Sequence, residues 1–211
     1  MRAGAAARLD RLAVDAPDVV AAYLGIEEGR SLTVRREVRR RAGPGTAEGM
    51  VRQLAATADA LSSVVGGLPP AAIDWPGGEA DWNVAQTIGH VATARSGLVL
   101  AASLAAQGRW PADAPVVVPG LPGSADADVP ALIARIGQSQ RIVERAARAV
   151  AGHETDACPL DHPLVGRLRC GEWLLFAGVH DVMHLEQLHE IAAGFAGIAT
   201  VAEPSRARPV G

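Results

Sequence analysis

Four long segments of this chain carry apolar residues at helical spacing, and stretches rich in Pro and Gly separate them. They cover approximately residues 47–65, 83–106, 129–151 and 171–194. Apolar side chains that recur every three or four positions predict amphipathic helices, whereas a stretch such as GGLPPAAIDWPGGEADW interrupts them. We therefore predict an all-α protein built around a four-helix bundle.

The connection between the second and third of these helices is long and reads GRWPADAPVVVPGLPGSADADVP. Bundles in which neighbours alternate in direction use short loops, while a long connection lets the chain cross over between parallel neighbours. We predict such a crossover here. Asp128, with Pro130 after it, is the expected N-cap of the third helix, and Asp81 or Asn83 is that of the second.

We divide the chain into an extension (residues 1–44), the bundle (residues 45–197) and a flexible tail (residues 198–211). The 211 residues are 49% hydrophobic, enough to bury the core of one domain with additions. The formal net charge of −3 gives no general attraction to nucleic acid or membranes, so we expect small-molecule partners. We see no apolar run of about 20 residues and no signal peptide, and expect a cytoplasmic protein.

Within the extension, DAPDVVAAYLGIEEG predicts a short helix ended by glycine. RSLTVRREVRRR, with Leu32, Val34 and Val38 at even positions, predicts a strand. An isolated strand needs a partner, so we predict a homodimer in which the strands of two chains pair. RSLTVRREVRRR contains no aromatic residue for stacking on bases and no recognition helix is predicted, so we interpret its arginines as a solvated face: Arg30, Arg35, Arg36, Arg39, Arg40 and Arg41.

Residue types exclude several chemistries. All of the basic residues are arginine, which excludes Schiff-base lysines and the P-loop lysine. Cys158 and Cys170 do not form a CxxC motif, so they indicate a reduced pair and neither a zinc knuckle nor a redox centre.

Three of the six histidines lie in VHDVMHLEQLHE, within the fourth predicted helix. At about 100° per residue, His184 lies about 40° from His180, and His189 lies about 180° away. His180 and His184 therefore share the apolar face and are close enough to bind one ion, whereas His189 should face solvent. Two histidines four apart are also common in hydrogen-bonded cores, and a catalytic zinc-type site needs a third ligand.

His90, in the second turn of the second predicted helix, is the candidate third ligand. The residues that share its face are small or polar, which suits a cavity better than a dry core: Gln86, Thr87, Thr93 and Ala94. A core histidine with satisfied hydrogen bonds is the alternative.

The GHV at His90, preceded by a tryptophan, together with HPLVGRLRCGEWLLFAGVHDVMHLEQL, resembles the DinB-like superfamily of four-helix-bundle metalloproteins over roughly residues 49–196. That superfamily includes bacillithiol and mycothiol S-transferases. The resemblance implies a crossover after the second helix and a divalent metal (Zn, Ni, Fe or Mn) bound by His90, His180 and His184. APDVVAAYLGIEEGRSLTVRREVRR separately resembles the start of the UTRA domain of GntR-type regulators, but the rest of such a regulator is absent, so no function is carried over.

The resemblance implies a thiol S-transferase that uses a low-molecular-weight thiol, such as mycothiol, on a small electrophile. A hydrolase that activates water on the metal is the alternative, although no carboxylate lies on the predicted metal face as a general base. A non-enzymatic binding or regulatory protein is a third interpretation.

Further side chains are candidates for the site, each with a structural alternative. Gln86, Gln187 and Asp181 are candidates for orienting ligands or substrate, although Asp181 is also a candidate surface ion-pair partner. Arg95 and Arg109 are candidates for binding an acidic group of a thiol or substrate. Three tryptophans are candidates for the pocket wall: Trp82, Trp110 and Trp173. For Trp82 and Trp173, packing in the core is the favoured interpretation.

Overall fold

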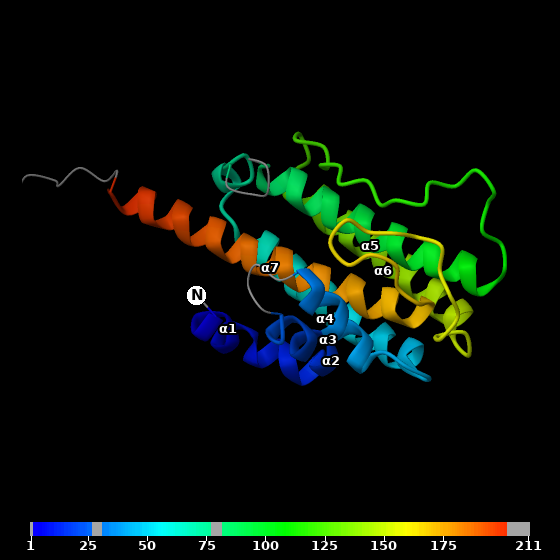
Figure 1. Cartoon of the computed structure of the whole chain (residues 1–211). Coiled ribbons are helices and arrows are strands. Elements are labelled where there is room, and N and C mark those ends of the chain that lie inside the picture. Colours follow the sequence, from blue (N-terminus) through cyan, green and yellow to red (C-terminus); the bar gives the residue numbers. More distant parts are fainter. Residues whose placement is uncertain (1, 27–30, 77–81, 202–211) are drawn as a thin grey trace, which may run out of the picture.

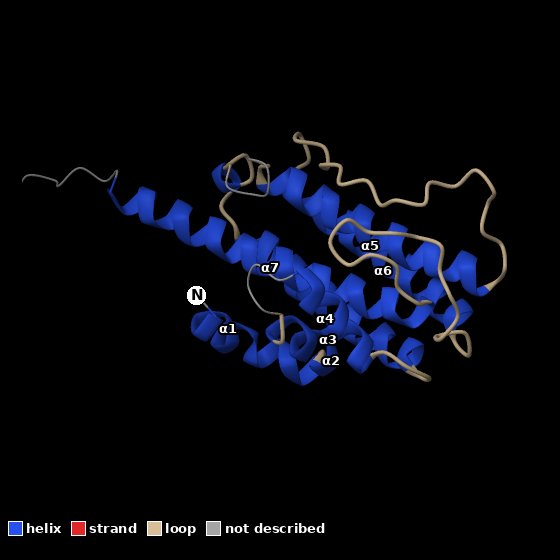
Figure 2. Cartoon of the chain, in the orientation of Figure 1, coloured by secondary structure: helices blue, strands red, loops and turns tan. Residues whose placement is uncertain are grey.

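The computed structural model describes residues 2–26, 31–76 and 82–201, and the regular secondary structure in these parts of the chain is helical. The bundle consists of α4 (Thr46–Gly67), α5 (Val84–Ala106), α6 (Val129–Val150) and α7 (Cys170–Val201), with a short 3-10 turn, η1 (Pro70–Ala72), after α4. Figure 2 shows helices joined by loops, and among the described residues there are isolated β-bridges but no strands. The predicted all-α four-helix bundle is confirmed.

Side-chain caps begin two of these helices where the sequence predicts them. Asn83 Oδ1 accepts a hydrogen bond from the Gln86 backbone at 2.8 Å, and Gln86 Oε1 accepts one from the Asn83 backbone at 3.1 Å, which makes a capping box for α5. Asp128 caps α6 by accepting from the Ala131 backbone at 2.8 Å. Asp81, the alternative cap of α5, lies outside the described residues.

The connection between α5 and α6 runs back along α5, as predicted for a crossover. Its last part reaches the first turns of α5, where the Gly123 backbone donates to the Gln86 carbonyl at 2.9 Å. A Cβ on Gly89 would lie 2.7 Å from Gly123 Cα, so this contact requires glycine. Because the chain returns to the start of α5 before α6 begins, α5 and α6 run parallel (Figure 1).

Each helix of the bundle packs against two main neighbours. Both α4 and α5 pack against α6 and α7, so α4 lies diagonally across from α5. By length and composition α5 would also pass for a membrane span, but most of that apolar window is buried inside the protein. The core formed by α6, α7 and the crossover accounts for this composition without a membrane.

The extension is where the sequence analysis is wrong about local structure. It consists of α1 (Arg2–Asp15), α2 (Pro17–Leu24) and α3 (Ser31–Arg41), and the predicted strand is the helix α3. Val34 and Val38 are four residues apart and both are buried, while Leu32 is 70% exposed, so one apolar face of a helix replaces the expected alternation.

Charge pairing one turn apart also favours the helix, since Arg41 pairs with Glu37. The strand that motivated the homodimer prediction is therefore absent, and the resemblance to a UTRA domain is not borne out. The three helices pack against α4 and α7.

At the C-terminal end of the chain, α7 continues to Val201, so residues 198–201 of the predicted tail are helical. Residues 202–211 lie outside the described part.

Candidate metal centre

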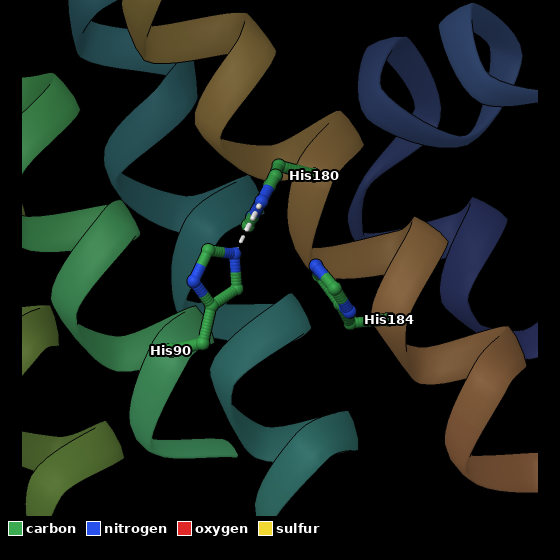
Figure 3. Close-up of side chains that lie close together, drawn as sticks. All are labelled: His90, His180 and His184. Atoms are coloured by element: carbon green, nitrogen blue, oxygen red, sulfur yellow. Dashed lines mark hydrogen bonds between the residues drawn. The ribbon is translucent and has the colours of Figure 1, made fainter. Parts of the chain in front are cut away.

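Three histidine rings point toward one another between α5 and α7 (Figure 3). His90 comes from α5, and His180 and His184 lie one turn apart on α7. Their ligand atoms all lie within 4.8 Å of one another, and the three residues are buried. The fold thus brings together the three histidines that the sequence analysis selected from distant segments.

The spacing of the nitrogens fits a single ion. The Nε2 atoms of His90 and His180 are 3.3 Å apart. Two nitrogens that each lie about 2.0–2.1 Å from one ion, at a tetrahedral angle, are separated by about 3.3–3.4 Å. The ring centroids of His180 and His184 are 4.6 Å apart, and that of His90 lies 5.2 Å from each of them. Imidazole nitrogens suit several first-row divalent ions, Zn, Ni and Fe among them.

Hydrogen bonds on the outer nitrogens orient two of the rings. His90 Nδ1 lies 2.8 Å from the Leu121 carbonyl oxygen, and His184 Nδ1 lies 2.8 Å from Gln187 Oε1. Because these oxygens only accept, Nδ1 carries the proton in both rings and the Nε2 lone pairs face the centre. Gln187 is thus placed to orient the ring of His184, in line with its candidate role. Sequence reasoning missed Leu121, since its contribution is a backbone carbonyl with no side-chain signal.

The third ring is neutral. Burial lowers the pKa of His180 well below its ordinary value, and His184 and His90 lower it further. Neutral imidazole is the form that binds metal ions. His180 Nδ1 is buried and has no hydrogen-bond partner among the described residues. The donor set, its spacing and its protonation therefore fit a divalent metal.

His189 faces away from this centre, as predicted. It lines a groove of about 1020 Å³ together with residues of α1 and α4. The prediction that His189 faces solvent is met only in part, because α1, which the sequence analysis did not foresee, covers part of that face. The side chain is half-buried, and burial lowers its pKa.

Arg95 and Asp181 pair with each other in the interior. Both are 0% exposed and joined by an ion pair. Asp181 also accepts from the Thr57 hydroxyl at 2.7 Å, and Arg95 donates to the Leu54 carbonyl and to Gln140. Burial raises the pKa of Asp181, while Arg95 and Thr57 act in the opposite direction.

This network corrects two interpretations of the sequence. Asp181 is not a surface residue, and its hydrogen bonds go to Thr57 and Arg95 and not to a histidine. Both terminal nitrogens of the Arg95 guanidinium donate to partners inside the protein, and the side chain is 0% exposed, so it does not reach out toward a cofactor.

Gln86 and Arg109 do not converge on the histidines. The Gln86 oxygen is engaged in the capping box of α5. Arg109 follows the last turn of α5, and the helical rise places Ala106 about 24 Å from His90. Arg109 is exposed at that far end, so a contact with a ligand of the metal is excluded for it.

Aromatic rings form walls around the centre. The Trp82 ring lies 5.0 Å from that of His90, and the Phe176 ring lies 6.2 Å from that of His180. Trp82 thus borders the centre, whereas Trp173 is fully buried in the core, as its structural alternative stated. His162, from the connection before α7, stacks edge-on against Phe176 at 5.1 Å and also lowers the pKa of His180.

A helical bundle with a crossover, in which one histidine of the second long helix meets two of the fourth, defines a class of metal-binding bundle proteins. The comparison with known families agrees, since the model described as DinB superfamily matches residues 53–188. The chain belongs to the DinB superfamily. The match contains all three histidines and leaves out α1–α3. No curated protein and no solved structure gives a significant match.

Proposed function

We propose that the protein is a metal-dependent thiol S-transferase that joins a low-molecular-weight thiol, of the mycothiol type, to a small electrophile. The observation that carries the proposal is the convergence of three histidine side chains in a buried site. A divalent ion held there would lower the pKa of a thiol or water beside it.

The residues around the histidines supply orientation and a dry environment. The Leu121 carbonyl and Gln187 fix the rings of His90 and His184, and the rings of Trp82 and Phe176 lie beside His90 and His180. In the proposed reaction a sulfur–carbon bond forms, the leaving group takes the electron pair of the broken bond, and the thiol proton passes to solvent.

We prefer thiol transfer to hydrolysis because Asp181 and Glu154, two carboxylates that could act as a general base, are engaged in other interactions. Asp181, the carboxylate next to His180, is held by Arg95 and Thr57. In the connection before α7, Glu154 accepts from the backbones of Gly45 and Gly152. A water nucleophile needs a general base, whereas a thiol with a lowered pKa is already ionised at neutral pH.

The test begins with elemental analysis of the purified protein, followed by thiol consumption with a mycothiol-type thiol and an electrophilic haloarene under Zn, Ni, Fe or Mn. We expect His180→Ala to lose both metal and turnover, and His189→Ala, on the opposite face of the same helix, to keep both. Retention of full metal content by His180→Ala would contradict the site. Turnover that consumes the electrophile without thiol would contradict the transferase.

A further inference from the structure

A pocket of about 290 Å³ lies outside the histidine centre, between α5 and the crossover connection. One wall is a single face of α5, which runs from His90 through Gly97 and Ala101 to Leu104. The opposite wall consists of the connection from Trp110 to Leu121, and Leu160 reaches in from the connection before α7.

The wall chemistry indicates the kind of ligand. Among the residues that the structure describes, no charged side chain lines the pocket, and apart from the indole of Trp110 its polar side chains are those of His90 and Thr93. A charged group would lose its hydration here without gaining a partner, whereas apolar surface gains from leaving water.

Its dimensions favour a chain or a substituted ring over a compact molecule. A dry cavity of about 150 Å³ accepts benzene, and this pocket is about twice that size. The α5 residues that line it lie between His90 and Leu104, and the helical rise between these two residues is about 21 Å. A pocket so long for its volume is narrow.

Apolar side chains at the rim remain open to solvent. Leu100, Val117 and Leu121 line the pocket and are 49%, 53% and 64% exposed. Exposed large apolar side chains that line one pocket mark a binding surface more often than isolated ones do.

The pocket is continuous with the metal centre through two residues. His90 lines both, and Leu121, at the same end of the pocket, holds the His90 ring through its carbonyl. A ligand lying along α5 would therefore end beside the metal ligands.

We propose that this pocket binds the uncharged, elongated apolar part, alkyl or arylalkyl, of the electrophile whose reactive carbon is presented at the histidine centre. The assignment rests on the proposed function for the identity of the reacting end. The pocket itself is tested without turnover.

The binding experiment uses the full chain and N-phenyl-1-naphthylamine, an uncharged fluorescent probe. Its sulfonated analogue 8-anilinonaphthalene-1-sulfonate measures the penalty for charge. We expect the uncharged probe to bind more tightly, and 1-alkanols to displace it with an affinity that rises roughly fourfold for each added methylene. Equal or tighter binding of the sulfonate, or displacement that is independent of chain length, would overturn the proposal.

Gly97→Leu fills the pocket from a position where a Cβ meets nothing within 4 Å. Leucine also suits a helix better than glycine does, so the variant should fold. Gly137→Leu on α6 is the matched control, since its Cβ site is equally open and lies outside the pocket. We expect Gly97→Leu to weaken probe binding at least tenfold and the control to leave it unchanged.

Two further measurements separate this proposal from the proposed function. His180→Ala should lose metal and keep the probe affinity, while Gly97→Leu should keep metal and raise the KM of a long-chain electrophile more than that of a short-chain one. Normal probe binding without any thiol-dependent turnover would refute the transferase and support the pocket. Equal probe binding by Gly97→Leu and Gly137→Leu, or a change in oligomeric state as the only effect of Gly97→Leu, would refute the pocket.

Discussion

Removal of Arg95 tests whether the buried ion pair between α5 and α7 is structural. In Arg95→Met the apolar stem remains but Asp181 loses its counter-ion while 0% exposed. Loss of one partner from a buried pair costs about 3–5 kcal/mol. The Leu54 carbonyl also loses a donor, which adds about 1–3 kcal/mol. We expect the free energy of unfolding, measured by urea titration, to fall by about 4 kcal/mol or more at neutral pH.

The loss of stability in Arg95→Met should depend on pH, and the pKa of Asp181 determines the direction of this dependence. Burial already raises the pKa of Asp181, and Arg95→Met removes the cation that opposes this, so the pKa rises further. When the pKa of a carboxyl is higher in the folded than in the unfolded protein, the carboxyl stabilises the fold at pH values below its unfolded pKa. That contribution is lost as the pH rises through its folded pKa. The difference between variant and parent should therefore shrink as the pH falls toward about 4.

The double variant Arg95→Met, Asp181→Leu provides the control. It removes both charges, so it should be more stable than Arg95→Met alone despite carrying one more substitution. A double variant that is less stable than either single one would refute the reasoning. A higher KM for the thiol in Arg95→Met at unchanged stability would instead restore Arg95 as a residue that binds the cosubstrate.

Two more substitutions test how the metal ligands are held. Gln187→Leu should lower the metal affinity about 10–100-fold, because the hydrogen bond that orients His184 is lost. Competition with a chromophoric chelator measures this affinity. Gln138→Leu, on the exposed face of α6, is the control and should leave the affinity unchanged. Gly89→Ala places a Cβ 2.7 Å from Gly123 Cα and should cost about 1–3 kcal/mol in thermal unfolding, whereas Gly137→Ala should be neutral or slightly stabilising.

The parts of the structure that follow from local pattern could be predicted. Long apolar periods bounded by Pro and Gly gave the four bundle helices, and the short side chains of Asn83 and Asp128 marked two of their starts. The three histidines could be selected because helical geometry relates His180 to His184 and excludes His189, while the family resemblance supplied His90.

Features that depend on another segment of the chain could not be predicted. The spacing of Val34 and Val38 fits one face of a strand or of a helix, and packing of the helix against α2 and α7 decides between them. Asp181 lies on the flank of the apolar face, where a carboxylate is usually solvated. Its burial depends on Arg95, which lies 86 residues away along the chain.

The crossover connection is held by hydrogen bonds from Val116 onwards, and this has a consequence for altering the protein. Near its middle, Val118 donates to the Asp161 carbonyl at 2.9 Å, and near its end Gly123 is held against α5. The stretch from Trp110 to Pro115 lies between the end of α5 and Val116, whose carbonyl accepts from the Asp161 backbone at 2.6 Å. Residues there can be exchanged in a combinatorial library, or lengthened by insertion, while the histidines keep their positions. This stretch is therefore where the wall of the proposed apolar pocket can be changed most freely.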